Sequence, residues 1–117
     1  MKNPGEFVLS LMNARTAAHV AHLRTTSYAK HMALDGFYND IVPLIDTFAE
    51  AYQGCYGLIN FTGSSFKLEK DPVVLLDGLK AVMTSARAEC KETALQNIID
   101  EMIGLTAQTL YKLRNLQ

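Results

Sequence analysis

The sequence predicts an all-α fold, a four-helix bundle with one long crossover between its second and third helices. Three observations predict this fold class. Four segments have apolar residues at helical spacing, the connections within the first and the last pair are short, and a long polar segment separates the pairs. The 117 residues fit a single domain over 1–117, and an apolar content of 49% provides a core.

The first two predicted helices are joined by a short polar turn. The first covers residues 5–24, where apolar side chains recur every three or four positions. A Thr-Thr-Ser cluster ends it, and Ser27 can cap the second helix, which is predicted over 28–53. We expect Gly54 to stop this helix and Pro43 to bend it.

Capping signals predict the third and fourth helices. Asp71 and Pro72 form an N-cap and a first helical residue for the third helix, which ends near Cys90. Thr93 and Gln96 form a capping box for the fourth. The apolar positions that we expect to pack inward are Val74, Leu75, Leu79, Val82, Met83 and Ala86 in the third helix and Leu95, Ile98, Ile99, Met102, Leu105, Leu110 and Leu113 in the fourth.

The segment over 54–70 determines the predicted topology. Its 17 residues reach about 56 Å when extended, whereas the second helix is about 39 Å long. The segment can therefore travel the whole bundle, so that the second and third helices run parallel in a ferritin-like arrangement. Cys55, Ser64 and Ser65 are expected to be loop residues in this crossover.

Composition excludes several classes of function. Eleven Lys and Arg residues nearly balance twelve Asp and Glu residues, so DNA binding is not expected. No apolar run approaches the length of about 18 residues that a membrane span needs. Cys55 and Cys90 lack metal-ligand spacing, which favours free thiols and a cytoplasmic location.

Four polar side chains form a stripe along the second predicted helix. His31 and Asp35 are four residues apart, as are Asp46 and Glu50, and eleven residues separate the pairs, which returns them to nearly the same side. The two ends of the stripe are about 28 Å apart. They can meet only if a second copy runs antiparallel across a two-fold axis, placing His31 opposite Glu50 and Asp35 opposite Asp46. Imidazole with carboxylate suits iron, manganese or zinc, although such a stripe can also be an ordinary solvated face.

With His19 added, the five residues resemble a ferroxidase pattern. The series His19, His31, Asp35, Asp46 and Glu50 has the intervals twelve, four, eleven and four. This spacing, and the segments Leu-Asp-Gly-Phe and Ile-Asp-Thr-Phe-Ala-Glu around it, resemble the Dps family of bacterial mini-ferritins. The resemblance implies these five residues as metal ligands, with the first three from one subunit and the last two from its two-fold mate.

The resemblance also implies a function. A Dps-like protein is a homo-oligomer that binds ferrous iron at a subunit interface and oxidises it with hydrogen peroxide or oxygen. The stretch from His22 to Gly57 is also similar to small ferritin-like proteins of tailed bacteriophages, which implies work in an infected bacterium and allows His22 as a sixth ligand. The alternative for His22 is a hydrogen-bonding residue at the end of its helix. The alternative to the Dps-like function is a metal-free helical oligomer for assembly or partner binding, with contacts from Tyr38, Val42, Tyr52 and Tyr56.

Overall fold

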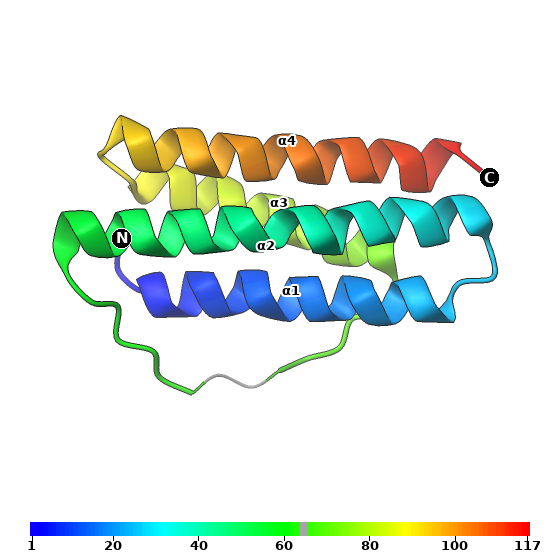
Figure 1. Cartoon of the computed structure of the whole chain (residues 1–117), viewed down its shortest axis with the longest axis horizontal. Helices are drawn as coiled ribbons and strands as arrows, with labels where there is room; N and C mark the ends of the chain where they lie inside the picture. Colours follow the sequence, from blue (N-terminus) through cyan, green and yellow to red (C-terminus); the bar gives the residue numbers. More distant parts are fainter. Residues whose placement is uncertain (64–65) are drawn as a thin grey trace.

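The computed structural model describes residues 1–63 and 66–117. Its elements are four α-helices, namely α1 (Pro4–Arg24), α2 (Tyr28–Tyr56), α3 (Pro72–Glu89) and α4 (Thr93–Asn115) (Figure 1). The described part of the chain contains no strand. The predicted all-α class and the four-helix bundle are therefore confirmed.

Each helix packs against two others. α1 contacts α2 and α3, and α4 contacts the same two helices, so α1 and α4 occupy opposite corners of the bundle. In Figure 1, α2 and α3 run from right to left, whereas α1 and α4 run from left to right. The described parts of the connection between α2 and α3 pass beside α1, because a Cβ on Gly5 would meet the carbonyl oxygen of Asn60 at 2.5 Å.

Large apolar side chains from all four helices fill the centre of the bundle. Their fully buried members are Leu11, Leu34, Phe37, Ile41, Phe48, Leu76, Met83, Leu95, Ile99 and Met102. Two expected core residues of α3 are not in this core, since Val74 is 55% and Val82 is 42% exposed. The inward side of α3 is taken by Leu76, Leu79, Met83 and Ala86. The expected apolar stripe was therefore misplaced, because it included Val74 and Val82 and left out Leu76.

Two of the predicted N-caps form as expected. The Ser27 hydroxyl oxygen accepts a hydrogen bond from the backbone N–H of Lys30 at the start of α2. The Asp71 carboxylate accepts from the backbone N–H groups of Val73 and Val74 at the start of α3. These bonds satisfy donors that the first turn of a helix leaves without an intrahelical partner.

The predicted end of α2 is wrong by three residues. The helix continues through Gly54 and Cys55 to Tyr56, and the positive φ of 96° falls on Gly57, which is the C-cap. Cys55 therefore lies in a helix and not in the crossover. Ser64 and Ser65, which were also expected in the crossover, lie outside the described residues.

The predicted capping box of α4 does not form. Glu92 occupies the N-cap position without a side-chain cap hydrogen bond, and Thr93 is already the first helical residue. The Gln96 side-chain amide instead donates to the carbonyl oxygen of Cys90, 2.8 Å away, the C-cap residue of α3 at the start of the α3–α4 turn.

Candidate functional site

The turn between α1 and α2 brings the three histidines of the chain together. His19 and His22 lie in the last turns of α1, and His31 lies in the first turn of α2. Only residues 25–27 separate the helices, and the Ser27 cap fixes where α2 begins. The ring centroids of His19 and His22 are 6.0 Å apart, and those of His22 and His31 are 3.7 Å apart.

His22 and His31 are joined by reciprocal hydrogen bonds. The Nδ1 atom of His22 lies 2.8 Å from the carbonyl oxygen of His31, and the Nδ1 atom of His31 lies 2.8 Å from the carbonyl oxygen of His22. The two rings are stacked with an interplanar angle of 21°. His22 is 8% exposed, whereas His31 is half-buried. The pair therefore fastens the end of α1 to the start of α2.

Tyr38 connects the histidines to the first predicted carboxylate. Its ring stacks on His19 at 4.1 Å between centroids and meets His22 edge-on at 5.2 Å. Its hydroxyl donates to Oδ1 of Asp35, 3.1 Å away, and the Arg15 guanidinium carbon lies 5.2 Å from the ring centroid. Burial and then the Asp35 hydrogen bond raise the pKa of Tyr38 above its ordinary value. The phenol is thus neutral and orients the carboxylate.

Three of the five predicted ligands therefore fall in one cluster. His19, His31 and Asp35 lie at the α1–α2 turn, but they do not converge on one point, because His22 contacts both of the other rings and Tyr38 takes the Asp35 carboxylate. The sequence allowed His22 as an optional ligand or as a hydrogen-bonding residue at the helix end, and the structure shows the hydrogen bond. Tyr38 was expected only as an interface aromatic. The available signal was spacing, since Tyr38 follows Asp35 by three residues and lies on the same side of α2.

The other two predicted ligands lie farther along α2. Asp46 and Glu50 are both exposed, and Asp46 is about 16 Å from Asp35 along the helix axis. Asp46 lines a shallow groove of about 150 Å³ between α1 and α2, together with Met12, Arg15, Thr16, Val42 and Ile45. The five residues thus form two separate groups, and the second group, Asp46 and Glu50, consists of carboxylates alone.

A single chain does not complete a metal site. Within residues 1–63 and 66–117, no group of three or more His, Cys, Asp or Glu side chains could hold a metal ion. His19, His31 and Asp35, which the resemblance assigned to one subunit, therefore do not form a metal-holding group within the described residues of one chain.

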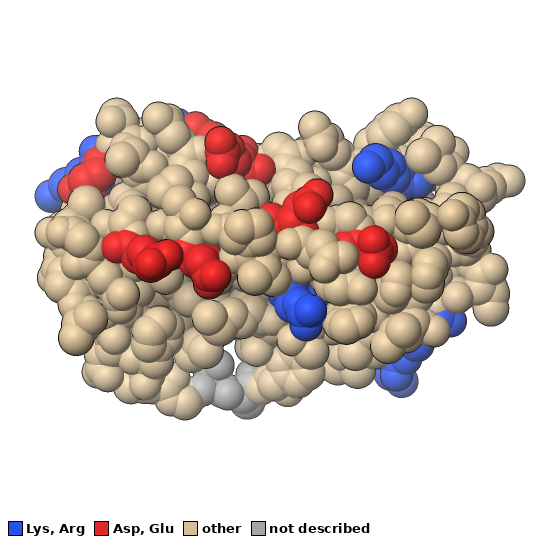
Figure 2. Space-filling view, in the orientation of Figure 1, with Lys and Arg blue, Asp and Glu red and all other residues tan. Residues whose placement is uncertain are grey.

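The surface of α2 is acidic. The helix carries Asp35, Asp40, Asp46 and Glu50 against a single basic residue, Lys30. Figure 2 shows acidic side chains in a row along α2, with basic atoms over α1 beside the row. Such a row repels a second copy of itself unless cations lie between the two surfaces.

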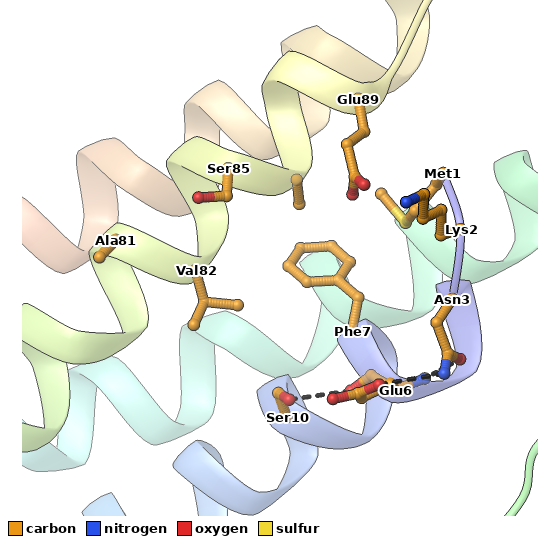
Figure 3. A pocket seen from close by; sticks show the side chains of 11 residues that line it. Met1, Lys2, Asn3, Glu6, Phe7, Ser10, Ala81, Val82, Ser85 and Glu89 are labelled. Atoms are coloured by element: carbon orange, nitrogen blue, oxygen red, sulfur yellow. Dashed lines mark hydrogen bonds between the residues drawn. The ribbon is translucent and has the colours of Figure 1, made fainter.

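A second pocket, larger than the groove beside Asp46, lies elsewhere. It is a groove of about 420 Å³ between the start of α1 and the end of α3. Figure 3 shows its labelled lining residues, Met1, Lys2, Asn3, Glu6, Phe7, Ser10, Ala81, Val82, Ser85 and Glu89. The Asn3 amide and the Ser10 hydroxyl are already bonded to Glu6, within α1's own first turns. None of the five predicted ligands lines this pocket, so it is separate from the candidate site.

Comparison with known proteins gives a family. Residues 22–113 match the model of DUF5856, described as a family of unknown function. The chain belongs to this family. It is also 34% identical over 111 residues to the "Uncharacterized 14.6 kDa protein in mobD-ri intergenic region" of Enterobacteria phage T4, covering 92% of this chain and 85% of the phage protein. No solved structure matches.

The DUF5856 match covers four of the five predicted ligands. Its first residue is His22, so it includes His31, Asp35 and the two carboxylates of the second group but not His19. Neither the DUF5856 description nor the name of the phage protein states a ligand or an activity. Among the helices of the described residues, none is long and apolar enough to cross a membrane.

Proposed function

We propose that this DUF5856 protein binds ferrous iron at a site shared by two copies of the chain and oxidises it. The observation that carries the proposal is the division of the predicted ligands into two groups. His19, His31 and Asp35 gather at the α1–α2 turn, while Asp46 and Glu50 lie exposed about three turns farther along α2. Each group is incomplete, and an antiparallel second copy supplies the other.

The proposed two-fold pairing places α2 against α2 of the partner. It sets His31 opposite Glu50 and Asp35 opposite Asp46, so each dimer contains two equivalent sites. Exposed apolar side chains on α1 and α2 support a partner surface here; they are Met12, Leu23, Tyr28, Met32 and Val42.

The charge of the proposed interface supports metal binding. Two acidic α2 surfaces that face each other repel, and divalent cations held between imidazole and carboxylate groups remove that repulsion. The donor set of two imidazoles and three carboxylates suits iron, with manganese or zinc as competitors.

The proposed reaction is the oxidation of ferrous to ferric iron, with iron as the substrate. Two ferrous ions give up one electron each, and one molecule of hydrogen peroxide takes these two electrons and two protons from solvent to form two molecules of water; oxygen is the other candidate oxidant. His19, His31 and the three carboxylates hold the ion, and the carboxylates offset the higher charge of the ferric product. Tyr38 orients the Asp35 carboxylate through its hydroxyl.

The proposed topology is the ferritin-like bundle with one long crossover. It is supported by the common direction of α2 and α3 in Figure 1 and by the length of the connection over 57–71. A phage T4 relative favours a role in an infected bacterium.

The experiment that tests this function compares ferrous oxidation in matched variants. We expect the double variant Asp46→Asn, Glu50→Gln to slow the rise of ferric absorbance after peroxide addition by about tenfold or more, because it removes one half of each site. Glu101→Gln is the matched control, since Glu101 is an exposed carboxylate of α4 and lies outside the acidic surface of α2. It should oxidise iron at the parent's rate.

The opposite result identifies the alternative. If the double variant oxidises iron as fast as the parent, the ferroxidase proposal is wrong. Elemental analysis of protein purified without chelator then tests the metal-free oligomer. That alternative expects no iron, manganese or zinc near one atom per subunit, with contacts from Tyr38, Val42 and Tyr56. Tyr52 no longer qualifies as a contact, because it is 8% exposed and packs in the core.

A further inference from the structure

The reciprocal bonds between His22 and His31 determine where each ring carries its hydrogen. Both Nδ1 atoms lie 2.8 Å from a carbonyl oxygen, and a carbonyl oxygen only accepts hydrogen bonds. Each Nδ1 must therefore be the donor. In the neutral ring, the other nitrogen, Nε2, then carries a lone pair that is free to bind a metal.

The stacking of the rings prevents both from binding the same ion. Their centroids are 3.7 Å apart and their planes differ by only 21°. A metal ion binds imidazole in the plane of the ring at about 2.0–2.1 Å. An ion in the plane of one ring lies well outside the plane of the other, so one ring can be the ligand and the other cannot.

Burial decides which ring is the ligand. His31 is half-buried and lies one turn before Asp35 on α2. His22 is 8% exposed and is enclosed by His31 on one side and by the edge contact with Tyr38 on another. His22 therefore lacks the access that a metal ligand needs in this arrangement.

We propose that His22 is a positioning residue. It holds the His31 ring so that the unprotonated Nε2 atom of His31 binds the metal. Its Nδ1–H bond to the His31 carbonyl fixes the first turn of α2, and its ring covers one face of His31. The backbone carbonyl of His22 in turn accepts a hydrogen bond from the His31 Nδ1–H group. Metal-binding histidines commonly have their second nitrogen fixed by such a bond. The inference rests on the proposed function, because it assigns the role of His22 at that same site.

The test measures the tautomer of His31 and the affinity for iron separately. Long-range ¹H–¹⁵N spectra of metal-free protein, recorded well above the ordinary imidazole pKa of about 6.5, report which nitrogen is protonated. We expect Nδ1–H in both His22 and His31 of the parent, the opposite of the form that a free histidine side chain favours. Titration with ferrous iron under anaerobic conditions gives the affinity.

His22→Phe keeps an aromatic ring for stacking and keeps the backbone carbonyl of residue 22 that accepts from His31 Nδ1, but it removes the Nδ1–H bond that fixes the first turn of α2. Without that bond the first turn of α2 can move the His31 ring away from its acceptor. We expect His31 in this variant to shift toward the Nε2–H form and the affinity for ferrous iron to fall by about 10- to 100-fold. Ser27→Ala is the control, because it removes the α2 cap at the same turn and leaves the imidazole pair in place. It should lower the unfolding midpoint without moving the His31 tautomer or the iron affinity.

The possible results separate this inference from the proposed function. If the parent's His31 carries its hydrogen on Nε2, the positioning role is wrong even if iron binds. The same holds if His22→Phe binds iron as tightly as the parent with an unchanged tautomer. If the parent binds no iron, the proposed function is wrong. If its spectra then still show Nδ1–H in His22 and His31, the two histidines only connect α1 to α2 and position no metal ligand.

Discussion

At the scale of single residues, Tyr56 connects two helices through its hydroxyl group. It lies at the end of α2 and donates to the carboxylate of Glu92, the N-cap residue of α4. Its ring also packs on Tyr52, with the centroids 4.8 Å apart. The hydrogen bond to Glu92 and, after it, burial raise the pKa of Tyr56 to about 12.

This pKa predicts how stability changes in alkali. The folded-state pKa lies above the ordinary value of 10.0, so between these values the folded chain keeps a proton that the unfolded chain loses. The stabilisation is fully present below about pH 10 and is lost as the pH rises to about 12. We expect the parent to have a higher urea midpoint than Tyr56→Phe below about pH 10, and this difference to shrink above it. A difference that stays constant over this range would contradict the assignment.

The residues of the candidate site were predictable only in part. The resemblance to the Dps family assigned His19, His31 and Asp35 to one subunit, and the structure places all three in the cluster at the α1–α2 turn. The spacing of Tyr38 from Asp35 was a signal for the hydrogen bond between them, but the ring contacts of His22 and Tyr38 were not predictable. They depend on how the rings of α1 and α2 are oriented across the interface between the helices, which residue spacing within one helix does not determine.

At the scale of the elements, local chemistry predicted helix starts better than helix ends. Ser27 and Asp71 cap their helices as expected, because a cap hydrogen bond reaches only two or three residues. The end of α2 depended on distant contacts. Tyr56 is held by Glu92 from another helix, and the helix therefore extends past Gly54 to the next glycine.

The close approach of α1 to the crossover gives a second stability prediction. A Cβ on Gly5 would lie 2.5 Å from the carbonyl oxygen of Asn60, a backbone atom that cannot rotate away. We expect Gly5→Ala to lower the free energy of unfolding by about 1–3 kcal/mol, measured by urea denaturation. Gly104→Ala is the control, since a Cβ there has no neighbour within 4 Å, and it should stabilise α4 by about 0.5–1 kcal/mol. Equal effects of the two substitutions would show that α1 and the crossover do not pack this closely.

At the scale of the whole molecule, the bundle has principal extents of 43 × 28 × 20 Å. The class of fold was predictable because helical spacing and loop length are properties of the chain itself. The pairing of two chains is not such a property. It depends on whether the acidic row on α2 faces the same row of a second chain with metal ions between the two rows. The partner surface was inferred from this row and from exposed apolar side chains.

Each proposed site takes residues from two chains, and mixing two defective variants tests this sharing. One variant carries His31→Ala and Asp35→Asn, and the other carries Asp46→Asn and Glu50→Gln. After the two are unfolded and refolded together in equal amounts, half of the dimers are mixed, and each mixed dimer has one intact site of two. We predict that each variant alone is nearly inactive in ferrous oxidation and that the mixture regains about a quarter of the parent's rate. A mixture that stays as inactive as its components, while the parent oxidises iron, would contradict the shared site.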